Sequence, residues 1–372
     1  MKDTPVPCPV DAIPTLDPHG FSNASRRAVA EFVAEGTPTN TARSYASALR
    51  YWAAWMQGRY ALPFGNQPLP VPVVVQFILD HLPRRTKLGL QHELPPALDA
   101  ALVADGAKGG IGALSYNTVA HRLAVLARWH KSRGWPAATD DARVATLLSK
   151  ARSAQVRRGV TVSKKTAAVR EPLEAMLATC TDGLCGLRDR ALLLLTWSGG
   201  GRRRSEVASF QVEDLRRLDD MTWVYALGTT KTDDSGTRRE KPLRGPVISA
   251  LQVWLTEAKL TEGPLFRRLQ RGGHIGKRGI TGDEVARIVK RRAALAGLSG
   301  DWAAHSLRSG FVTEAGRQGV PLGEVMAMTE HRSVATVIGY FQAGSLLSSR
   351  SATLLGTSPN AEAQQTPPPL LD

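Results

Sequence analysis

The sequence predicts a mainly α-helical fold with a small antiparallel β-sheet, divided into two domains. Its 372 residues exceed the usual size of one domain, and 42% of them are hydrophobic, which is enough for packed cores. Apolar residues recur at helical spacing through most of the chain, but they alternate as in a strand near Tyr225. We therefore expect an all-helical N-terminal domain followed by a mixed α+β domain.

Composition divides the chain into five segments. Residues 1–20 are rich in Pro and Asp, residues 357–372 are rich in Ser, Gln and Pro, and we expect both ends to be disordered. Residues 156–170 are basic and β-branched without a sustained apolar stripe, which indicates a linker near phosphates. The helical domain is then expected over 21–155, and the α+β domain over 171–356.

Three helices stand out in the first domain. The first begins where Thr39 and its neighbour Asn40 offer N-caps, and the second covers about 71–82. The third begins at Ser115 or Asn117 and carries an apolar stripe along one face. The intervening segment, from Arg84 to Ala113, contains Gly and Pro, so we expect a short helix and a loop there.

Basic side chains lie off the apolar stripes of the first and third helices. They can either contact DNA or remain solvated charges, which is the common role of a single surface Arg. The formal net charge of +15 and a pI of about 10.2 favour a polyanionic partner, nucleic acid first. The candidate DNA-contacting residues are Arg43, Arg50, His121, Arg128 and Lys131.

The second domain alternates helices with a short β element. Alternation over residues 221–228 predicts a strand, and a turn at Asp233–Gly236 leads into a return strand, with Lys231 near the tip of the hairpin. Thr281 and Glu284 form a capping box that predicts a helix start. Further helices are expected over 186–198, 246–258, 306–316, 321–331 and 333–342.

Several classes of protein do not fit this sequence. Three cysteines do not make a disulfide framework, and the N-terminus has no apolar signal-peptide region. The longest apolar run, Ala191–Trp197, is far too short to span a membrane. We expect a cytoplasmic protein that needs neither a metal nor another cofactor.

Four polar patches in the second domain attract a chemical interpretation. They are Gly201-Arg202-Arg203-Arg204-Ser205-Glu206-Val207, Lys231, His305-Ser306-Leu307-Arg308, and His331 followed nine residues later by Tyr340. Each has an ordinary explanation when taken alone: a solvated charge cluster, a turn lysine, a surface pair and a core tyrosine. Their order along the chain gives them a joint meaning.

In that order, residues Leu187 to Tyr340 resemble the catalytic domain of the tyrosine recombinase (phage integrase) family, especially its Cre-like members. The first patch resembles the family's Gly-x-Arg-x-Ser-Glu, which places the catalytic arginine on Arg203 and the nearby acid on Glu206. Thr230-Lys231-Thr232 resembles the hairpin lysine segment. The third patch matches the His-x-Leu-Arg box through His305 and Arg308, and the fourth supplies His331 and the nucleophile Tyr340.

The sequence departs from the family pattern at three places. Arg202 and Arg204 flank Arg203, so the register rests on Ser205-Glu206. Glu330 stands where a glycine usually precedes the third-box histidine, and it brings a negative charge next to His331. Gly310 stands where a small hydroxyl or methyl residue is common. None of these departures removes a catalytic group.

The resemblance implies DNA cleavage and rejoining through a 3′-phosphotyrosine. Two guanidiniums, Arg203 and Arg308, suit a phosphodiester anion because each is planar and always charged. Lys231 would protonate the 5′ leaving oxygen, while His305 would manage the tyrosine proton. His331 would bond a non-bridging oxygen, and Glu206 would orient its neighbours.

The family also implies the partners: duplex DNA with a specific recombination site, and a homotetramer that holds two duplexes. Two alternatives remain at this point. One is a type IB topoisomerase-like enzyme that relaxes DNA, and the other is a non-catalytic DNA-binding regulator on the same fold.

Overall fold

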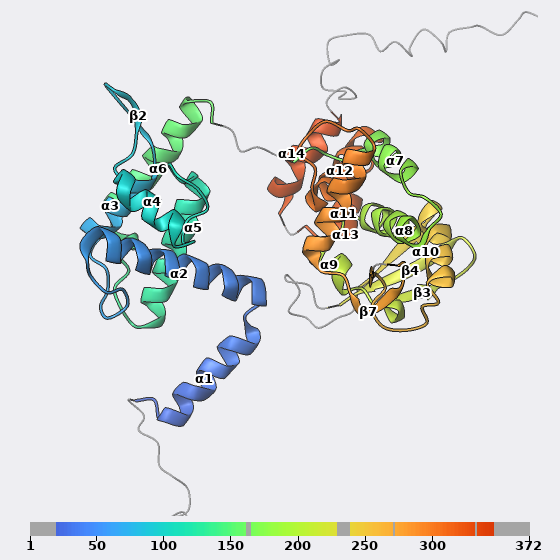
Figure 1. Ribbon diagram of the computed structural model, residues 1–372, viewed down its shortest axis with the longest axis horizontal. Helices are drawn as coiled ribbons and strands as arrows, with labels where there is room; N and C mark the ends of the chain where they lie inside the picture. The colour runs from blue at the N-terminus through green and yellow to red at the C-terminus, as the bar shows by residue number, and fades with distance from the viewer. Residues whose placement is uncertain (1–19, 161–164, 229–238, 271, 332, 346–372) are drawn as a thin grey trace, which may run out of the picture. The chain divides into compact units, whose positions relative to one another are not determined.

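The computed structural model of the chain separates into two compact units, Met1–Val162 and Ser163–Asp372 (Figure 1). The described residues are 20–160, 165–228, 239–270, 272–331 and 333–345. Helices dominate both units and every described sheet is small and antiparallel, so the predicted fold class is confirmed. Within the described ranges no helix is both long and apolar enough to cross a lipid bilayer.

The first unit is built from helices. They are α1 (Asn23–Gly36), α2 (Thr39–Tyr60), α3 (Val71–His81), α4 (Pro96–Ala104), α5 (Tyr116–Ser132) and α6 (Ala142–Arg157). The predicted start of α3 at residue 71 is confirmed. The N-cap predicted for α2 is wrong by one residue or two, because Pro38 is the N-cap and Thr39 is the first residue of the helix. Ser115 is the N-cap of α5, because its hydroxyl accepts a hydrogen bond from the backbone N–H of Thr118 at 3.2 Å.

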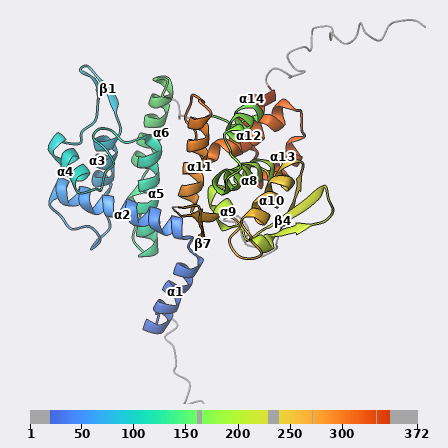
Figure 2. The same ribbon diagram turned by 45° about the vertical axis from the view of Figure 1, so that its right-hand side comes forward.

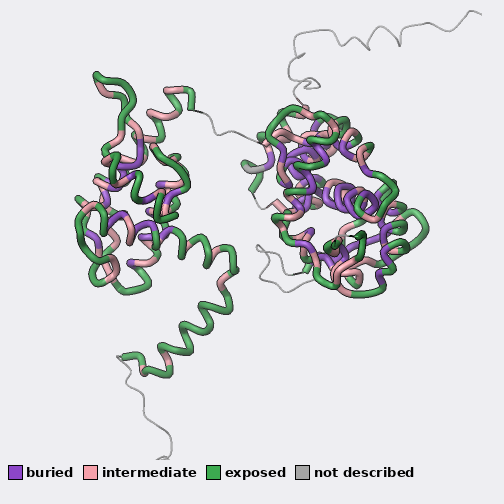
Figure 3. Tube along the Cα trace, viewed as in Figure 1, coloured by how far each residue is buried: buried purple, intermediate pink, exposed green. Residues whose placement is uncertain are grey.

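An aromatic cluster holds α2, α3 and α5 together. Trp52 of α2 stacks on Phe77 of α3 with ring centroids 3.8 Å apart, and its indole N–H donates to the carbonyl of Arg122 in α5 at 3.1 Å. Trp55 donates its indole N–H to Asp80 at 2.9 Å. All of these aromatic rings are fully buried, and burial of such large apolar surfaces is the main stabilising contribution in this unit (Figure 3).

Two features of the first unit were not predicted. Strands β1 (Arg84–Thr86) and β2 (Gly89–Gln91) pair as an antiparallel hairpin where we expected only a short helix and a loop. Three-residue strands are too short to show a convincing alternation in sequence. Helix α1 has no buried residue, and Phe32 on it is 75% exposed.

The second unit contains two small sheets. Strands β3 (Leu215–Arg217), β4 (Thr222–Leu227) and β5 (Arg239–Arg244) form an antiparallel sheet in that order. Both predicted strands of the β4–β5 pair are therefore confirmed. Strands β6 (Arg267–Leu269) and β7 (Ile275–Gly279) form a second pair that was not predicted.

Helix α8 lies in the interior of the second unit, against α7, α10 and α12 (Figure 2). The helices are α7 (Arg170–Ala178), α8 (Leu184–Ser198), α9 (Arg204–Ser209), α10 (Pro246–Glu257), α11 (Gly282–Leu295), α12 (Ala304–Arg317), α13 (Leu322–Thr329) and α14 (Val334–Ser345). The Thr281–Glu284 capping box at the start of α11 is confirmed. Because other elements pack around α8, the buried residues of this helix are distributed over nearly all of its faces.

Glycines allow α12 to approach its neighbours closely. A Cβ on Gly316 of α12 would lie 2.2 Å from the carbonyl oxygen of Phe341 in α14, and one on Gly344 would lie 1.9 Å from that of Thr313. On another face, a Cβ on Gly310 would lie 1.9 Å from the carbonyl oxygen of Ala168. The family-atypical glycine at 310 is therefore required by packing, since any side chain would meet backbone there.

We predict that Gly316→Ala separates α12 from α14 and destabilises the protein by about 2 kcal/mol. The reason is the clash with backbone, which cannot rotate away as a side chain can. Gly323→Ala is the matched control: Gly323 lies in α13 with open space around its Cβ position. It should be neutral or should stabilise by up to about 1 kcal/mol. Urea unfolding measures both, and equal effects would contradict the packing argument.

Candidate active site

A glycine turn after α8 brings three parts of the second unit together. Gly200 and Gly201 have φ values of 88° and 64°, which are unfavourable for residues with a Cβ. A Cβ on Gly201 would lie 2.6 Å from the Cα of Arg308, and one on Gly200 would lie 2.5 Å from the carbonyl oxygen of Met328. The turn therefore needs glycine both for its conformation and for its contact with α12 and α13.

Arg203 is the N-cap residue of the short helix α9, immediately after this turn. Its guanidinium donates from Nη1 to Oε1 of Glu206 at 2.6 Å, and its backbone N–H donates to Oε2 at 3.0 Å. The side chain of Arg203 is 33% exposed, whereas that of Glu206 is 11% exposed. Glu206 thus holds the guanidinium of Arg203 in one direction while leaving it open to a ligand.

Arg308 on α12 is buried at the centre of the site. It donates from Nη1 to the carbonyl oxygen of Gly201 and from Nη2 to that of Thr329, both at 2.7 Å. Burial, followed by the positive charges of Arg203 and Arg202, lowers the pKa of Arg308 to about 10. The guanidinium remains charged at neutral pH, within an excess of positive charge that an anion would relieve.

His331 lies against Arg308. Its Nε2 is 3.1 Å from Nη2 of Arg308, and its Nδ1 is 2.7 Å from the hydroxyl oxygen of Thr329. An arginine can only donate, so the arrangement suits a neutral ring that accepts through Nε2 and donates from Nδ1. Burial and then the charge of Arg308 lower the pKa of His331 to about 4, which also favours the neutral ring.

His305 and Tyr340 approach each other from α12 and α14. Their ring centroids are 6.0 Å apart at an interplanar angle of 68°, an edge-to-face contact. His305 lies one turn before Arg308 on the same helix. The Tyr340 ring therefore contacts the N-terminal half of α12, which also carries Arg308. Partial burial and then the charge of Arg308 lower the pKa of His305.

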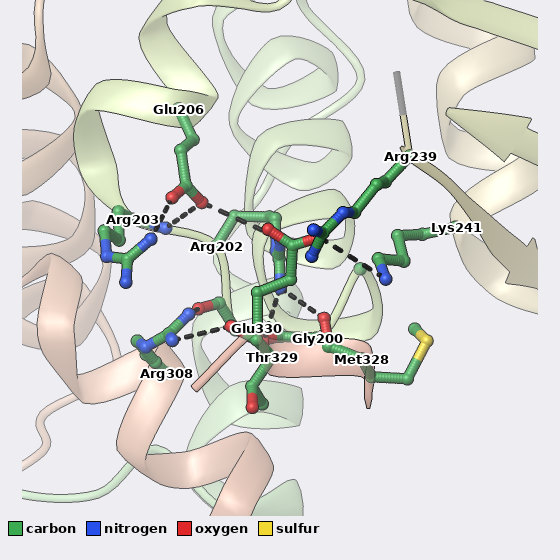
Figure 4. A network of polar contacts seen from close by, with 12 residues as sticks. Gly200, Arg202, Arg203, Glu206, Arg239, Lys241, Arg308, Met328, Thr329 and Glu330 are labelled. Atoms are coloured by element: carbon green, nitrogen blue, oxygen red, sulfur yellow. Dashed lines mark hydrogen bonds and ion pairs between the residues drawn. The ribbon is translucent and has the colours of Figure 1, made fainter. Parts of the chain in front are cut away.

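The carboxylate of Glu330 lies beside two cations of β5. The residue has a φ of 55°, in the left-handed region, which explains why a glycine is usual at this position. Its carboxylate lies 3.4 Å from Nζ of Lys241 and 3.9 Å from Nη1 of Arg239, both on β5 (Figure 4). Our expectation of a negative charge acting on His331 needs this correction, because the β5 cations pair with Glu330 instead.

Six of the seven predicted catalytic residues lie within the described part of the structure. Lys231 lies outside the described residues. The other six lie on one unit and come from α9 and the turn before it, from α12, from the turn after α13, and from α14: Arg203, Glu206, His305, Arg308, His331 and Tyr340. Among the described residues, no three His, Cys, Asp or Glu side chains form a group that could hold a metal ion.

The predicted DNA-contacting residues lie on α2 and α5 of the first unit. Arg43, Arg50 and His121 line one groove of about 480 Å³, and His121 is 2.9 Å from the hydroxyl of Ser44 within it. Arg128 is exposed on α5, 5.8 Å from the centre of the Tyr45 ring. Lys131 instead pairs with Asp140 at 2.9 Å, at the end of α5.

Sequence reasoning missed three residues next to these sites. Arg122 also lines the groove of the first unit, and its guanidinium lies 3.3 Å from the centre of the buried Tyr51 ring. In the second unit, Arg202 is fully buried and Lys241 contacts α13. The only sequence signal for Arg202 is its place in a run of three arginines, in which Ser205-Glu206 assigns the catalytic role to Arg203.

Comparison with known proteins gives a family for this arrangement. A sequence model described as the phage integrase family matches residues 169–345. The chain is 29% identical over 239 residues to an integrase/recombinase XerD homologue of Selenomonas ruminantium, covering 62% of this chain and 69% of the relative. It is 24% identical over 246 residues to the recombinase Cre of Escherichia phage P1, covering 62% and 71%.

Solved structures share the fold at low sequence identity. The XerH site-specific recombinase in a post-cleavage complex with palindromic difH matches with a TM-score of 0.55 and 17% identity, covering 90% of this chain and 85% of that one. A lambda integrase dimer bound to a core site matches with a TM-score of 0.51 and 14% identity, covering 86% and 76%. The family match, the relatives and the fold agree with the resemblance read from the sequence: residues 169–345 match the phage integrase family, and the chain is similar to tyrosine recombinases.

Proposed function

We propose that this recombinase cleaves duplex DNA at a specific site with Tyr340, and that a homotetramer exchanges the strands of two duplexes. The observation that carries the residue assignment is the environment of Arg308. This buried guanidinium lies among further positive charges, next to His331, and one helical turn from the His305–Tyr340 pair. Such a cluster suits one scissile phosphate.

In the proposed reaction, the Tyr340 hydroxyl oxygen attacks the phosphorus and forms the 3′-phosphotyrosine bond, while the bond to the 5′ oxygen breaks. Arg203 and Arg308 neutralise the non-bridging oxygens as negative charge grows on them. His305, whose pKa is lowered, is neutral at physiological pH and is able to accept the tyrosine proton. Lys231 is assigned the protonation of the 5′ oxygen.

The phosphate also changes the role proposed for His331. Without DNA, its Nε2 accepts from Arg308. A bound phosphate brings negative charge beside the ring and raises its pKa, so Nε2 can carry a proton toward a non-bridging oxygen. Glu206 acts on Arg203 by orienting it, because both carboxylate oxygens already accept hydrogen bonds from that residue.

The first unit is proposed to contact DNA through its groove on α2 and α5. Arg43, Arg50 and His121 present positive or polar groups there without a carboxylate among the lining residues. Phosphate contacts of this kind supply affinity, and they carry no sequence information by themselves. Arg128 is proposed to extend this surface, while Lys131 is partly neutralised by Asp140.

The oligomer and the partner are proposed from the relatives. Structures of the same fold include a lambda integrase tetramer bound to a Holliday junction, with a TM-score of 0.50 and 13% identity. The names of the sequence relatives, recombinases and integrases, favour recombination over topoisomerase-like relaxation or regulation without catalysis. Location in the cytoplasm remains a prediction.

We expect Tyr340→Phe to bind DNA as the wild type does and to form no covalent complex, because it lacks the attacking oxygen. Sequencing of the genomic DNA retained by the variant identifies the site. A duplex of that sequence, nicked beside the cleavage position, then traps the covalent complex on denaturing gels. Covalent complex with both proteins would exclude Tyr340 as nucleophile, and relaxation of plasmids lacking the site would favour the topoisomerase alternative.

We expect the double variant Arg43→Met/Arg50→Met to bind DNA more weakly at every sequence and to reduce the salt dependence of binding. If each arginine contacts one phosphate, the slope of log affinity against log salt falls by about two. Arg143→Met is the matched control, because Arg143 on α6 is exposed but pairs with Asp141 at 2.9 Å. Titrations at several salt concentrations measure the slope, and an unchanged slope would remove this groove from the DNA interface.

We expect His331 to make the DNA-free protein less stable in mild acid. Its folded pKa of about 4 lies below the ordinary value, so the unfolded chain binds the proton first as the pH falls. The stabilisation is fully present above about pH 6.5 and is lost as the pH falls toward 4.

Between pH 7.5 and pH 5, wild type should lose about 1 kcal/mol more stability than His331→Asn, after allowance for solvent screening. Urea unfolding at both pH values measures this difference. The buried His81 is common to both proteins, so its own titration cancels. Equal losses would show that the ring of His331 is not held neutral by its surroundings.

A further inference from the structure

The C-terminal end of α13 is capped by cations from three other elements. The last four carbonyls of a helix have no partner within the helix. In α13, that of Met326 accepts from the backbone N–H of Glu330 at 2.9 Å. Those of Ala327, Met328 and Thr329 accept from Lys241, Arg202 and Arg308 respectively. Positive charge at this end of a helix is also favoured by the helix dipole.

Arg202 is the unexpected member of this set. Its side chain is fully buried, and Nη2 donates to the carbonyl oxygens of Met328 and Gly200. Among the described residues, Nε and Nη1 have no hydrogen-bond partner, and the carboxylate of Glu206 lies 3.8 Å from Nη1. Burying a guanidinium with so few partners lowers the stability of the fold. Arg202 is therefore expected to have a role that offsets this cost.

The role of Arg202 follows from the residues that come directly after α13 in the chain. His331 comes two residues after Thr329, and its ring contacts the Thr329 hydroxyl. Helix α14, which carries Tyr340, begins at Val334. A displacement of the Met328 carbonyl would therefore move the residues proposed to bind phosphate and to attack it. Reactions of positioned groups are sensitive to displacements of about 1 Å.

We propose that Arg202 is a positioning residue for strand cleavage: its buried guanidinium, together with Lys241, fixes the C-terminal end of α13 and thereby sets His331 and Tyr340. It does so without touching the DNA, in contrast to Arg203, which is partly exposed at the site. This proposal rests on the roles assigned above to His331 and Tyr340. Glu330 completes the arrangement, because its buried carboxylate lies beside Lys241 and offsets part of the added charge.

The test compares Arg202→Met with Arg204→Met. Arg204 belongs to the same arginine run, but it is exposed and pairs with Asp283 at 2.7 Å. On the nicked duplex defined above, at saturating protein, Arg202→Met should form covalent complex at least tenfold more slowly than wild type. Its affinity for DNA should stay within twofold of wild type. Arg204→Met should match wild type in rate.

A duplex with sulfur in place of the 5′ leaving oxygen separates positioning from acid catalysis. A thiolate leaves without protonation, so this substrate restores cleavage when only the general acid is impaired. The Arg202→Met defect should persist on it, because the proposal concerns the nucleophile and the phosphate. Restored cleavage would overturn the proposal, as would a rate loss that is explained by weaker DNA binding.

Two further variants keep the test open if Arg202→Met does not fold. Arg202→Lys retains the charge and one donor, and Lys241→Met removes the neighbouring cap. Each should slow cleavage at least threefold with unchanged affinity. Wild-type rates in both would overturn the proposal.

Hydrogen exchange on the DNA-free protein gives a readout that needs no substrate. Amides of α13 and the start of α14 should exchange faster in Arg202→Met, or in Arg202→Lys, than in wild type and in Arg204→Met. Unchanged exchange there would overturn the proposal even if cleavage is slow. If wild type itself forms no covalent complex, the assignment of Tyr340 fails, and that outcome is distinct from failure of the Arg202 proposal.

Discussion

The catalytic unit depends on one close contact, that of the Gly200–Gly201 turn with α12 and α13. Because neither glycine has a Cβ, the backbone of the turn reaches Arg308 and Met328 directly. Guanidiniums then fill the junction by donating to backbone carbonyls: Arg308 to those of Gly201 and Thr329, and Arg202 to that of Met328. These hydrogen bonds join charged guanidiniums to neutral carbonyl oxygens. They hold the junction together, but they do not neutralise the positive charge of the two arginines.

That excess charge links the architecture to the chemistry. Glu206 is paired with Arg203 and Glu330 lies beside the cations of β5, so the two carboxylates offset only part of the charge around Arg308. The lowered pKa values of Arg308, His331 and His305 share one origin, namely burial among like charges. A phosphodiester is the kind of ligand that relieves this repulsion, and the gain is largest when its negative charge grows in the transition state.

The two units differ in where they place the arginines that we propose to contact DNA or to position the site. The first unit is held together by buried aromatic rings of α2 and α3, and it keeps its arginines on the outer faces of α2 and α5. The second unit buries Arg202 and Arg308 beside glycines and backbone carbonyls. Surface arginines can follow phosphates with little structural cost, whereas buried ones must be held in place by many fixed contacts.

Much of the fold and of the site could be predicted from local patterns. Helical periodicity identified α2, α3 and α5, and the Thr281–Glu284 box located the start of α11. Strand β4 was recognisable because Trp223, Tyr225 and Leu227 recur at every second position, as in a strand. The hairpin β1–β2 and the pair β6–β7 were not recognisable, because their short strands are stabilised by pairing with each other rather than by local preference.

The sequence by itself determined which chemical groups are present and in what order, from Arg203 to Tyr340, because side-chain identity and spacing are properties of the chain. It also determined the family, through motifs that need no coordinates. Only the tertiary structure decided that Arg202 points inward while Arg203 remains accessible, and that Glu330 turns toward β5. Those outcomes depend on which carbonyls and charges from elsewhere in the sequence lie within a few ångströms in the folded protein. Local sequence patterns do not encode these spatial distances.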